Sequence, residues 1–103
     1  MEFVIILINN NDCIITHAAR NDIAVFCPAF TDGFIGEILF EYNRKYPGLI
    51  IDGVQDVSRL NKSTQRAKQT GVIILGAGVI KHHIMNANLM RNGAKYCVNT
   101  STL

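Results

Sequence analysis

The sequence is short of charge, and this shortage limits the kinds of partner to expect. Only 17% of the 103 residues are charged, against 49% hydrophobic, and ten basic residues nearly balance eight acidic ones. The chain has no basic run and no alternation of basic and aromatic residues, so we do not expect it to bind nucleic acid. A small domain with so few charges exposes apolar surface, which suggests that a partner or further polypeptide covers part of it.

Long hydrophobic runs and paired cysteines are also missing. The apolar run Phe3–Ile8 is too short for a membrane span and lacks the basic flank and cleavage site of a signal peptide. Cys13, Cys27 and Cys97 are far apart and include no C-x-x-C pair, so we expect reduced thiols in a cytoplasmic protein. Repeats, low-complexity tracts and linkers are absent, and residues 1–103 therefore make one domain at most.

Apolar segments of strand length alternate with helical patterns along the chain. The expected strands are Phe3–Ile8, Ile23–Cys27, Leu49–Ile51, Val72–Leu75 and Tyr96–Val98. The expected helices are a short one through Ile14 and Ala19, one from Gly33 to Pro47, one capped by Asp56 and closed by Gly71, and one from Val79 to Gly93. This alternation predicts an α/β fold, a doubly wound, mainly parallel sheet with helices on both faces.

A glycine turn follows the expected strand Val72–Leu75. Gly76, Ala77 and Gly78 separate this strand from a helical pattern, so the stretch is typical of strand, tight turn and helix. The first amides of such a helix lack partners inside it, and small residues let an anion approach them. A dinucleotide fingerprint would need a third glycine where Lys81 stands, so the motif alone fits either a plain turn or a nucleotide contact.

Three ionisable side chains are candidates for ligand binding near the carboxyl ends of the expected strands. Asp32 and Glu37 lie on either side of a helix start, where they could cap the helix and complement its dipole, or bind ribose hydroxyls and an ammonium group. His82 shares a helical face with Asn86 and is either a proton acceptor or an ordinary surface histidine. Because His82 and the adjacent His83 point in different directions on a helix, we expect no metal site.

The stretch from Gly76 to Ala94 carries the most specific pattern in the chain. It reads GAGVIKHHIMNANLMRNGA, and it closely resembles the G-G-G-x-x-K-H-H-I-x-N-A-N-L-M-R-N-G-A segment of the deoxyhypusine synthase family. Three upstream stretches resemble that family's P-V-F-x-P-A-x-T-D-G, N-P-G-L-x-x-D and T-G-x-I-I-L-G patterns: Val25–Gly33, Tyr46–Asp52 and Thr70–Leu75. The resemblance runs in one order from about Thr16 to Val98.

The resemblance implies a Rossmann-like fold and an NAD-dependent transferase. In the family, spermidine is dehydrogenated by NAD, and its aminobutyl group passes through an imine on an enzyme lysine to a lysine of a translation-factor precursor. By position, Asp32 would contact NAD and Gly76–Gly78 would form the NAD-binding turn. His82 would contact spermidine and help move its protons, and Glu37 would bind a spermidine ammonium group.

Several departures from the family pattern bear on activity. Glu37 stands where the family has Asp, and its extra methylene shifts the carboxylate; Ala77 replaces a glycine of the turn. The family's W-G-K segment with the imine-forming lysine is not in this sequence, and Lys81 belongs to the K-H-H motif instead. We therefore expect a homologue that is inactive by itself. The alternatives are a regulatory module that joins complete synthase subunits in a homo- or hetero-oligomer, or a gene fragment without an independent role.

Overall fold

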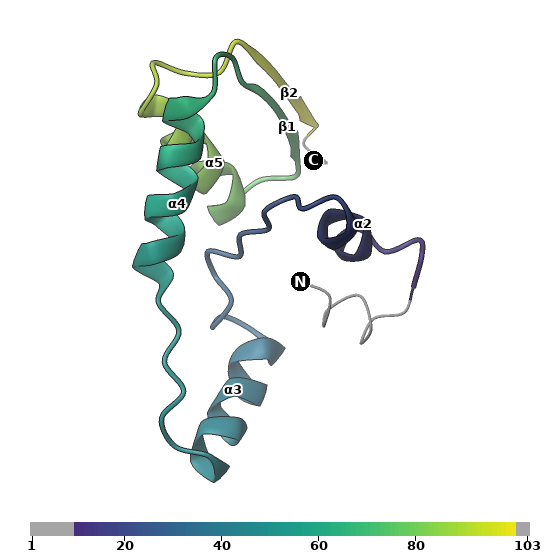
Figure 1. Ribbon diagram of the computed structural model, residues 1–103, viewed down its shortest axis with the longest axis vertical. Helices are drawn as coiled ribbons and strands as arrows, with labels where there is room; N and C mark the ends of the chain where they lie inside the picture. The colour runs from purple at the N-terminus through teal and green to yellow at the C-terminus, as the bar shows by residue number, and fades with distance from the viewer. Residues whose placement is uncertain (1–9, 101–103) are drawn as a thin grey trace.

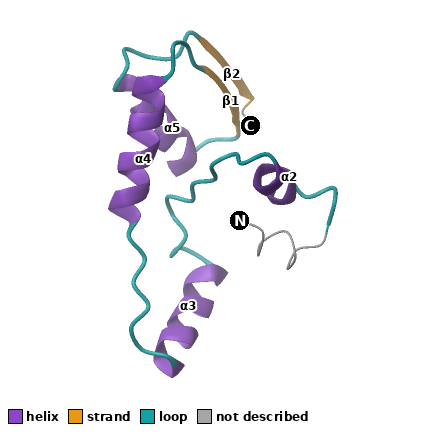
Figure 2. Ribbon diagram, in the orientation of Figure 1, coloured by secondary structure: helices purple, strands orange, loops and turns teal. Residues whose placement is uncertain are grey.

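The computed structural model describes residues 10–100, which form four helices and two strands (Figures 1 and 2). In chain order these are α2 (Ile14–Arg20), α3 (Phe34–Lys45), α4 (Gly53–Arg66), β1 (Gly71–Leu75), α5 (Val79–Leu89) and β2 (Tyr96–Thr100). The expected strand Phe3–Ile8 lies outside the described residues. Within residues 10–100, no helix has both the length and the apolar character that crossing a bilayer requires.

Strands β1 and β2 pair in parallel and are joined through α5. Their register sets Gly71 opposite Tyr96 and Leu75 opposite Thr100. A parallel pair needs a crossover connection, and α5 supplies it. In β1, Val72 and Ile74 are buried while Gly71, Ile73 and Leu75 are exposed, so β1 is covered on one face. All five residues of β2 are exposed.

Helix α4 packs on α5, and the two helices supply four of the eight buried residues in the described chain. Leu60 and Thr64 of α4 are buried, as are Ala87 and Asn88 of α5. The Thr64 hydroxyl donates a hydrogen bond to the carbonyl oxygen of Ala87 at 2.9 Å. This bond joins the two helices. Burying the Thr64 hydroxyl costs little free energy because the hydroxyl is hydrogen-bonded.

A partly buried polar network fixes the end of α5 to the segment that enters β1. Arg91 donates from Nη1 to Oγ1 of Thr70 at 2.9 Å, and from Nη2 to the carbonyl oxygens of Ala67 and Lys68 at 3.0 and 2.9 Å. The Thr70 hydroxyl donates to Oδ1 of Asn88, which is 2% exposed. Asn88 and Arg91 thus hold the βαβ unit together. Both belong to the stretch Gly76–Ala94, so two residues of that pattern have a structural role.

Two expected strands are not strands in the structure. Ile23–Cys27 and Leu49–Ile51 have no ladder partner among the described residues, although both are rich in β-branched side chains. Strand composition favours an extended backbone, but a strand forms only where another strand accepts its hydrogen bonds. The described residues are therefore α/β with a two-stranded parallel sheet, and the expected doubly wound sheet with helices on both faces is not seen in them.

The third expected helix begins and ends earlier than its sequence predicts. The N-cap of α4 is Asp52, whose carboxylate accepts a hydrogen bond from the N–H of Gln55 at 3.0 Å, so the assignment of the cap to Asp56 was wrong. Asp56 instead lies in the first helical turn. The helix ends at Arg66 rather than running on to Gly71, because Ala67 leaves the helical region with φ −66° and ψ 132°.

Helix α3 lies apart from the βαβ unit and buries none of its side chains. Figure 1 shows α3 at one end of the longest axis and the two strands toward the other end. The radius of gyration is 15.9 Å, whereas a compact domain of this length has about 13 Å. The chain is therefore more open than a self-contained domain of its size.

Candidate functional site

The glycine turn between β1 and α5 has the backbone geometry that its sequence predicts. Gly76 and Gly78 have φ values of 94° and 92°, a left-handed region that other residues rarely adopt. The N–H of Gly76 donates to the carbonyl oxygen of Thr100 at 2.8 Å, which anchors the turn to the end of β2. Gly78 then serves as the N-cap of α5.

The first turn of α5 presents backbone donors beside this turn. The N–H of His82 reaches the carbonyl oxygen of Gly78 at 3.2 Å, so the helix ladder begins there. The N–H groups of the three residues before it, Val79, Ile80 and Lys81, have no carbonyl four residues back inside the helix. A Cβ added at Gly76 or Gly78 would meet no atom within 4 Å. The turn is open on its outer side and fits an anionic group such as a phosphate.

The cavity under the turn is small. It has a volume of about 70 Å³ and is lined by the end of β1, the turn and the first two turns of α5, including Leu75, Ala77 and Lys81. That volume holds about two water molecules. A dinucleotide would therefore have to lie over the turn, where His82 is exposed and Lys81 is half-buried.

Asp32 and Glu37 lie together at the start of α3, away from the glycine turn in sequence. The N–H of Asp32 donates to the carbonyl oxygen of Ala29 at 3.1 Å, and Gly33, with φ 138°, is the N-cap of α3. Glu37 lies in the first turn, where its charge complements the helix dipole, and both carboxylates are exposed. Within residues 10–100, no hydrogen bond or ion pair connects either carboxylate to the junction of β1 and α5.

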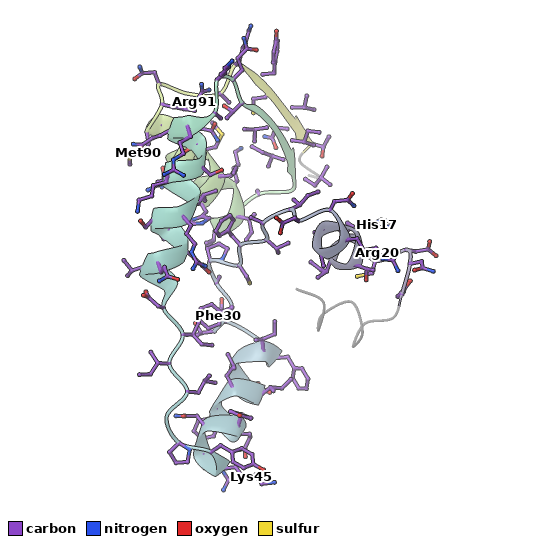
Figure 3. All side chains as sticks on the ribbon, in the orientation of Figure 1. His17, Arg20, Phe30, Lys45, Met90 and Arg91 are labelled. Carbon is purple, nitrogen blue, oxygen red and sulfur yellow. The ribbon has the colours of Figure 1, made fainter. Side chains whose placement is uncertain are left out.

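A larger cleft brings the loop before Asp32 next to α5. It has a volume of about 220 Å³, and Figure 3 shows one of its lining residues, Phe30, where this loop approaches α3. Its lining residues are Phe26, Cys27, Pro28, Phe30, Gly53, Asp56, Val57 and His83. This cleft was not predicted from the sequence, although the different directions of His82 and His83 on their helix were one signal for it. In the described part of the chain, no cluster of three metal-ligating side chains occurs.

Comparison with known proteins places these features in a family. Residues 5–103 match the family model described as deoxyhypusine synthase. The chain belongs to the deoxyhypusine synthase family. It is 53% identical over 85 residues to a probable deoxyhypusine synthase of Drosophila melanogaster, covering 82% of this chain and 23% of the relative. It is 50% identical over 97 residues to the deoxyhypusine synthase of Senecio vernalis, covering 92% of this chain and 26% of the relative.

The chain spans about a quarter of the length of the curated deoxyhypusine synthases it matches.

The predicted site residues fall into two groups in the structure. Gly76, Ala77, Gly78 and His82 lie together at the junction of β1 and α5, and Asp32 and Glu37 lie together at the start of α3. The two groups come from separate elements, and the cleft lined by Phe30 and His83 lies next to residues of both groups.

Proposed function

We propose that this chain forms one wall of a deoxyhypusine synthase active site, with NAD at the turn of residues 76–78 and spermidine beside His82. The observation that supports this most directly is the open turn with unpaired amides next to an exposed histidine, inside the longest family pattern of the chain. Such a junction suits the phosphates of a dinucleotide because amides and helix dipole both favour negative charge.

For NAD, the proposal assigns binding to Asp32, Gly76, Ala77 and Gly78. The amides at the start of α5 would hold the pyrophosphate, and the exposed carboxylate of Asp32 is free to accept ribose hydroxyls. Bound NAD supplies a hydride acceptor. Ala77 is exposed, so its methyl group narrows the approach of a ligand to the turn from that side.

For spermidine, the proposal assigns Glu37 and His82. The carboxylate of Glu37 would pair with an ammonium group of the polyamine, and a neutral His82 would accept a proton when an amine of spermidine is oxidised.

We expect the chain alone to form no deoxyhypusine, since the family's W-G-K segment is not in its sequence. The chain would be incubated with NAD, radiolabelled spermidine and the translation-factor precursor, with a full-length synthase as the positive control. Label transferred to the precursor lysine by this chain alone would contradict the proposal.

A chimera tests the residue assignments directly. The Drosophila relative would carry residues 16–98 of this chain in place of its own matching region. His82→Ala in that chimera should lower kcat by about 10² to 10⁴, the usual contribution of a general base. His17→Ala, at an exposed position of α2, is the control and should leave kcat unchanged. If the two substitutions change kcat equally, His82 does not act as the general base.

A second candidate is a regulatory module that binds a complete synthase subunit. The exposed apolar side chains of α3 and of the sheet favour it, because such surfaces mark protein contacts. Tagged chain mixed with purified full-length synthase should retain it on a column, and failure to retain it would count against this candidate. A broad melt by circular dichroism, without a cooperative transition, would instead favour a gene fragment without an independent role.

A further inference from the structure

The packing of α5 is concentrated at its C-terminal end. Its buried residues are Ala87 and Asn88, whereas Val79, Ile80 and His82 near its start are exposed. The turn that leads into the helix also has open space around both of its glycines. The position of the exposed end, which carries the candidate site, therefore depends on how firmly the buried end is held.

Thr70, the residue before β1, joins that buried end to both strands. Its hydroxyl accepts a hydrogen bond from Nη1 of Arg91 at 2.9 Å and donates one to Oδ1 of Asn88 at 2.7 Å. Its carbonyl oxygen accepts from the backbone N–H groups of Lys95 and Tyr96, at 2.9 and 3.4 Å, where β2 begins. One residue thus connects the entry of β1, the end of α5 and the entry of β2.

The hydrogen bonds of this network all run in one direction, from Arg91 into α5. Arg91 donates to Thr70, and Thr70 donates to Asn88. The side-chain amide of Asn88 then donates to the carbonyl oxygen of Ile84 at 2.8 Å. Hydrogen bonds in such a row polarise one another, so removing the middle hydroxyl weakens its neighbours as well. Ile84 lies two residues after His82, so the row ends in the helical turn that carries His82.

The distance from this anchor to His82 converts a small tilt of α5 into a large displacement. Asn88 and His82 are six residues apart on the helix, which is about 9 Å along its axis. A tilt of about 10° at Asn88 moves the backbone at His82 by about 1.5 Å over this length. Misplacing a reacting group by about 1 Å can lower a rate about a hundredfold. A loosened anchor is therefore enough to impair proton transfer at His82.

We propose that Thr70 is a positioning residue for the site at the opposite end of the βαβ unit, and that its hydroxyl sets the place of His82 through Asn88. The inference rests on the proposed role of His82 as a proton acceptor. Thr70 precedes β1 whereas the glycine turn follows it, so Thr70 acts at a distance from the turn. The hydroxyl is needed rather than the volume of the side chain, because a hydroxyl accepts from Arg91 and donates to Asn88 at the same time.

Two substitutions at Thr70 in the chimera described above test this role. Thr70→Val keeps the shape of the side chain but leaves Asn88 and Arg91 without the hydroxyl between them, so kcat should fall at least about tenfold. Thr70→Ser restores the hydroxyl and should keep kcat within about threefold of the parent chimera. Asp52→Ala removes the cap at the far end of α4 and is the control for lost stability, with kcat unchanged. Assays below the onset of melting, followed by circular dichroism, make kcat a property of folded enzyme.

Combining Thr70→Val with His82→Ala shows whether Thr70 acts through His82. We expect the double variant to be no slower than His82→Ala alone, because displacing a proton acceptor costs nothing once it is absent. Suppose that His82→Ala lowers kcat. Full activity of Thr70→Val, an equal loss in Thr70→Ser, or losses that multiply in the double variant would then overturn this inference and leave the proposed function standing. Full activity of His82→Ala would instead remove the proposed function and this inference with it.

Arg91→Lys replaces Thr70→Val if that variant is not folded at the assay temperature. Arg91 lies beside the end of α4 (Figure 3), and a lysine ammonium is a point charge that cannot keep its fork of bonds to Thr70 and to the carbonyl oxygens after α4. We expect kcat to fall at least about threefold, with no further loss when His82→Ala is added. Arg44→Lys, at an exposed position of α3, is the matched control. An unchanged kcat in Arg91→Lys would overturn the inference.

Discussion

Gly36 has no room for a side chain although it lies inside α3. A methyl group there would collide with the carbonyl oxygen of Thr31, in the loop that carries Asp32. Replacing glycine by alanine in an exposed helix usually stabilises by about 0.5–1 kcal/mol. We expect Gly36→Ala to lower the free energy of unfolding instead, because the Thr31 backbone must move.

Urea unfolding followed by circular dichroism measures this effect, with Gly53→Ala as the matched control. A methyl group at Gly53, the first residue of α4, would meet nothing within 4 Å, so this variant should show the usual gain. A gain of the same size at Gly36 would mean that the loop before α3 yields freely and that Gly36 does not fix the position of Asp32.

Cys13 is the residue whose chemistry the fold changes most clearly. The backbone N–H of Thr16, followed by that of Ile15, lowers the pKa of the Cys13 thiol, because these donors stabilise the thiolate. The folded chain therefore holds the thiolate at a lower pH than the unfolded chain does. This contribution to the stability of the folded chain is fully present above the pKa of the thiol in the unfolded chain. It is lost as the pH falls through the pKa of the thiol in the folded chain.

Alkylation of Cys13 by iodoacetamide, followed by mass spectrometry across pH, checks this prediction. The midpoint of the rate profile should lie lower in buffer than in urea. Identical midpoints in the two conditions would show that α2 does not form around Cys13 in solution.

At the scale of elements, α4 has two aspartates near its start, and the earlier one, Asp52, is its N-cap. Asp52 accepts the hydrogen bond from Gln55, whereas Asp56 contributes only a charge in the first turn and a distant contact of 3.8 Å to Arg59. Asp52→Ala should therefore destabilise the chain by about 1 kcal/mol, as the loss of a cap does. Asp56→Ala should cost only a few tenths, because exposed charges near a helix end contribute little. Thermal melts of both variants would show the order, and the reverse order would restore Asp56 as the cap.

The helices could be predicted from the sequence better than the strands. The patterns around Ile14, after Gly33 and after Gly78 each gave a helix in the right place, because helix periodicity and glycine stops are local signals. Ile23–Cys27 and Leu49–Ile51 have equally clear local signals for strands, yet neither pairs in the described chain. Pairing depends on a neighbouring strand, which no local pattern supplies.

In the candidate site too, local features could be predicted from the sequence and contacts between distant segments could not. The turn of Gly76, Ala77 and Gly78 was predictable, since consecutive small residues between a strand and a helix leave few alternatives. The roles of Asn88 and Arg91 were not, because their partners Thr70 and Ala67 come from a distant part of the sequence. The family pattern marked these residues without distinguishing those that hold the fold from those proposed to bind ligand.

At the scale of the molecule, the apolar excess of the sequence is found on the surface. The described chain leaves large hydrophobic side chains exposed on α3, on both strands and on the segments before α3 and α4. The sequence analysis expected such surface from the low charge, and this expectation is confirmed. The family relationship explains its extent, because the curated relatives are about four times as long as the region matched here.

The dependence of unfolding on urea should report this open architecture. The chain exposes 8576 Å², whereas a compact protein of 11.4 kDa exposes about 5,800 Å² and its unfolded chain about 16,500 Å². Unfolding therefore uncovers about a quarter less surface than for a compact domain. Because the m-value scales with that surface, dilute chain should give about three quarters of the m-value of a compact domain of equal length. A full m-value at the lowest concentration would mean that one chain covers its own sheet.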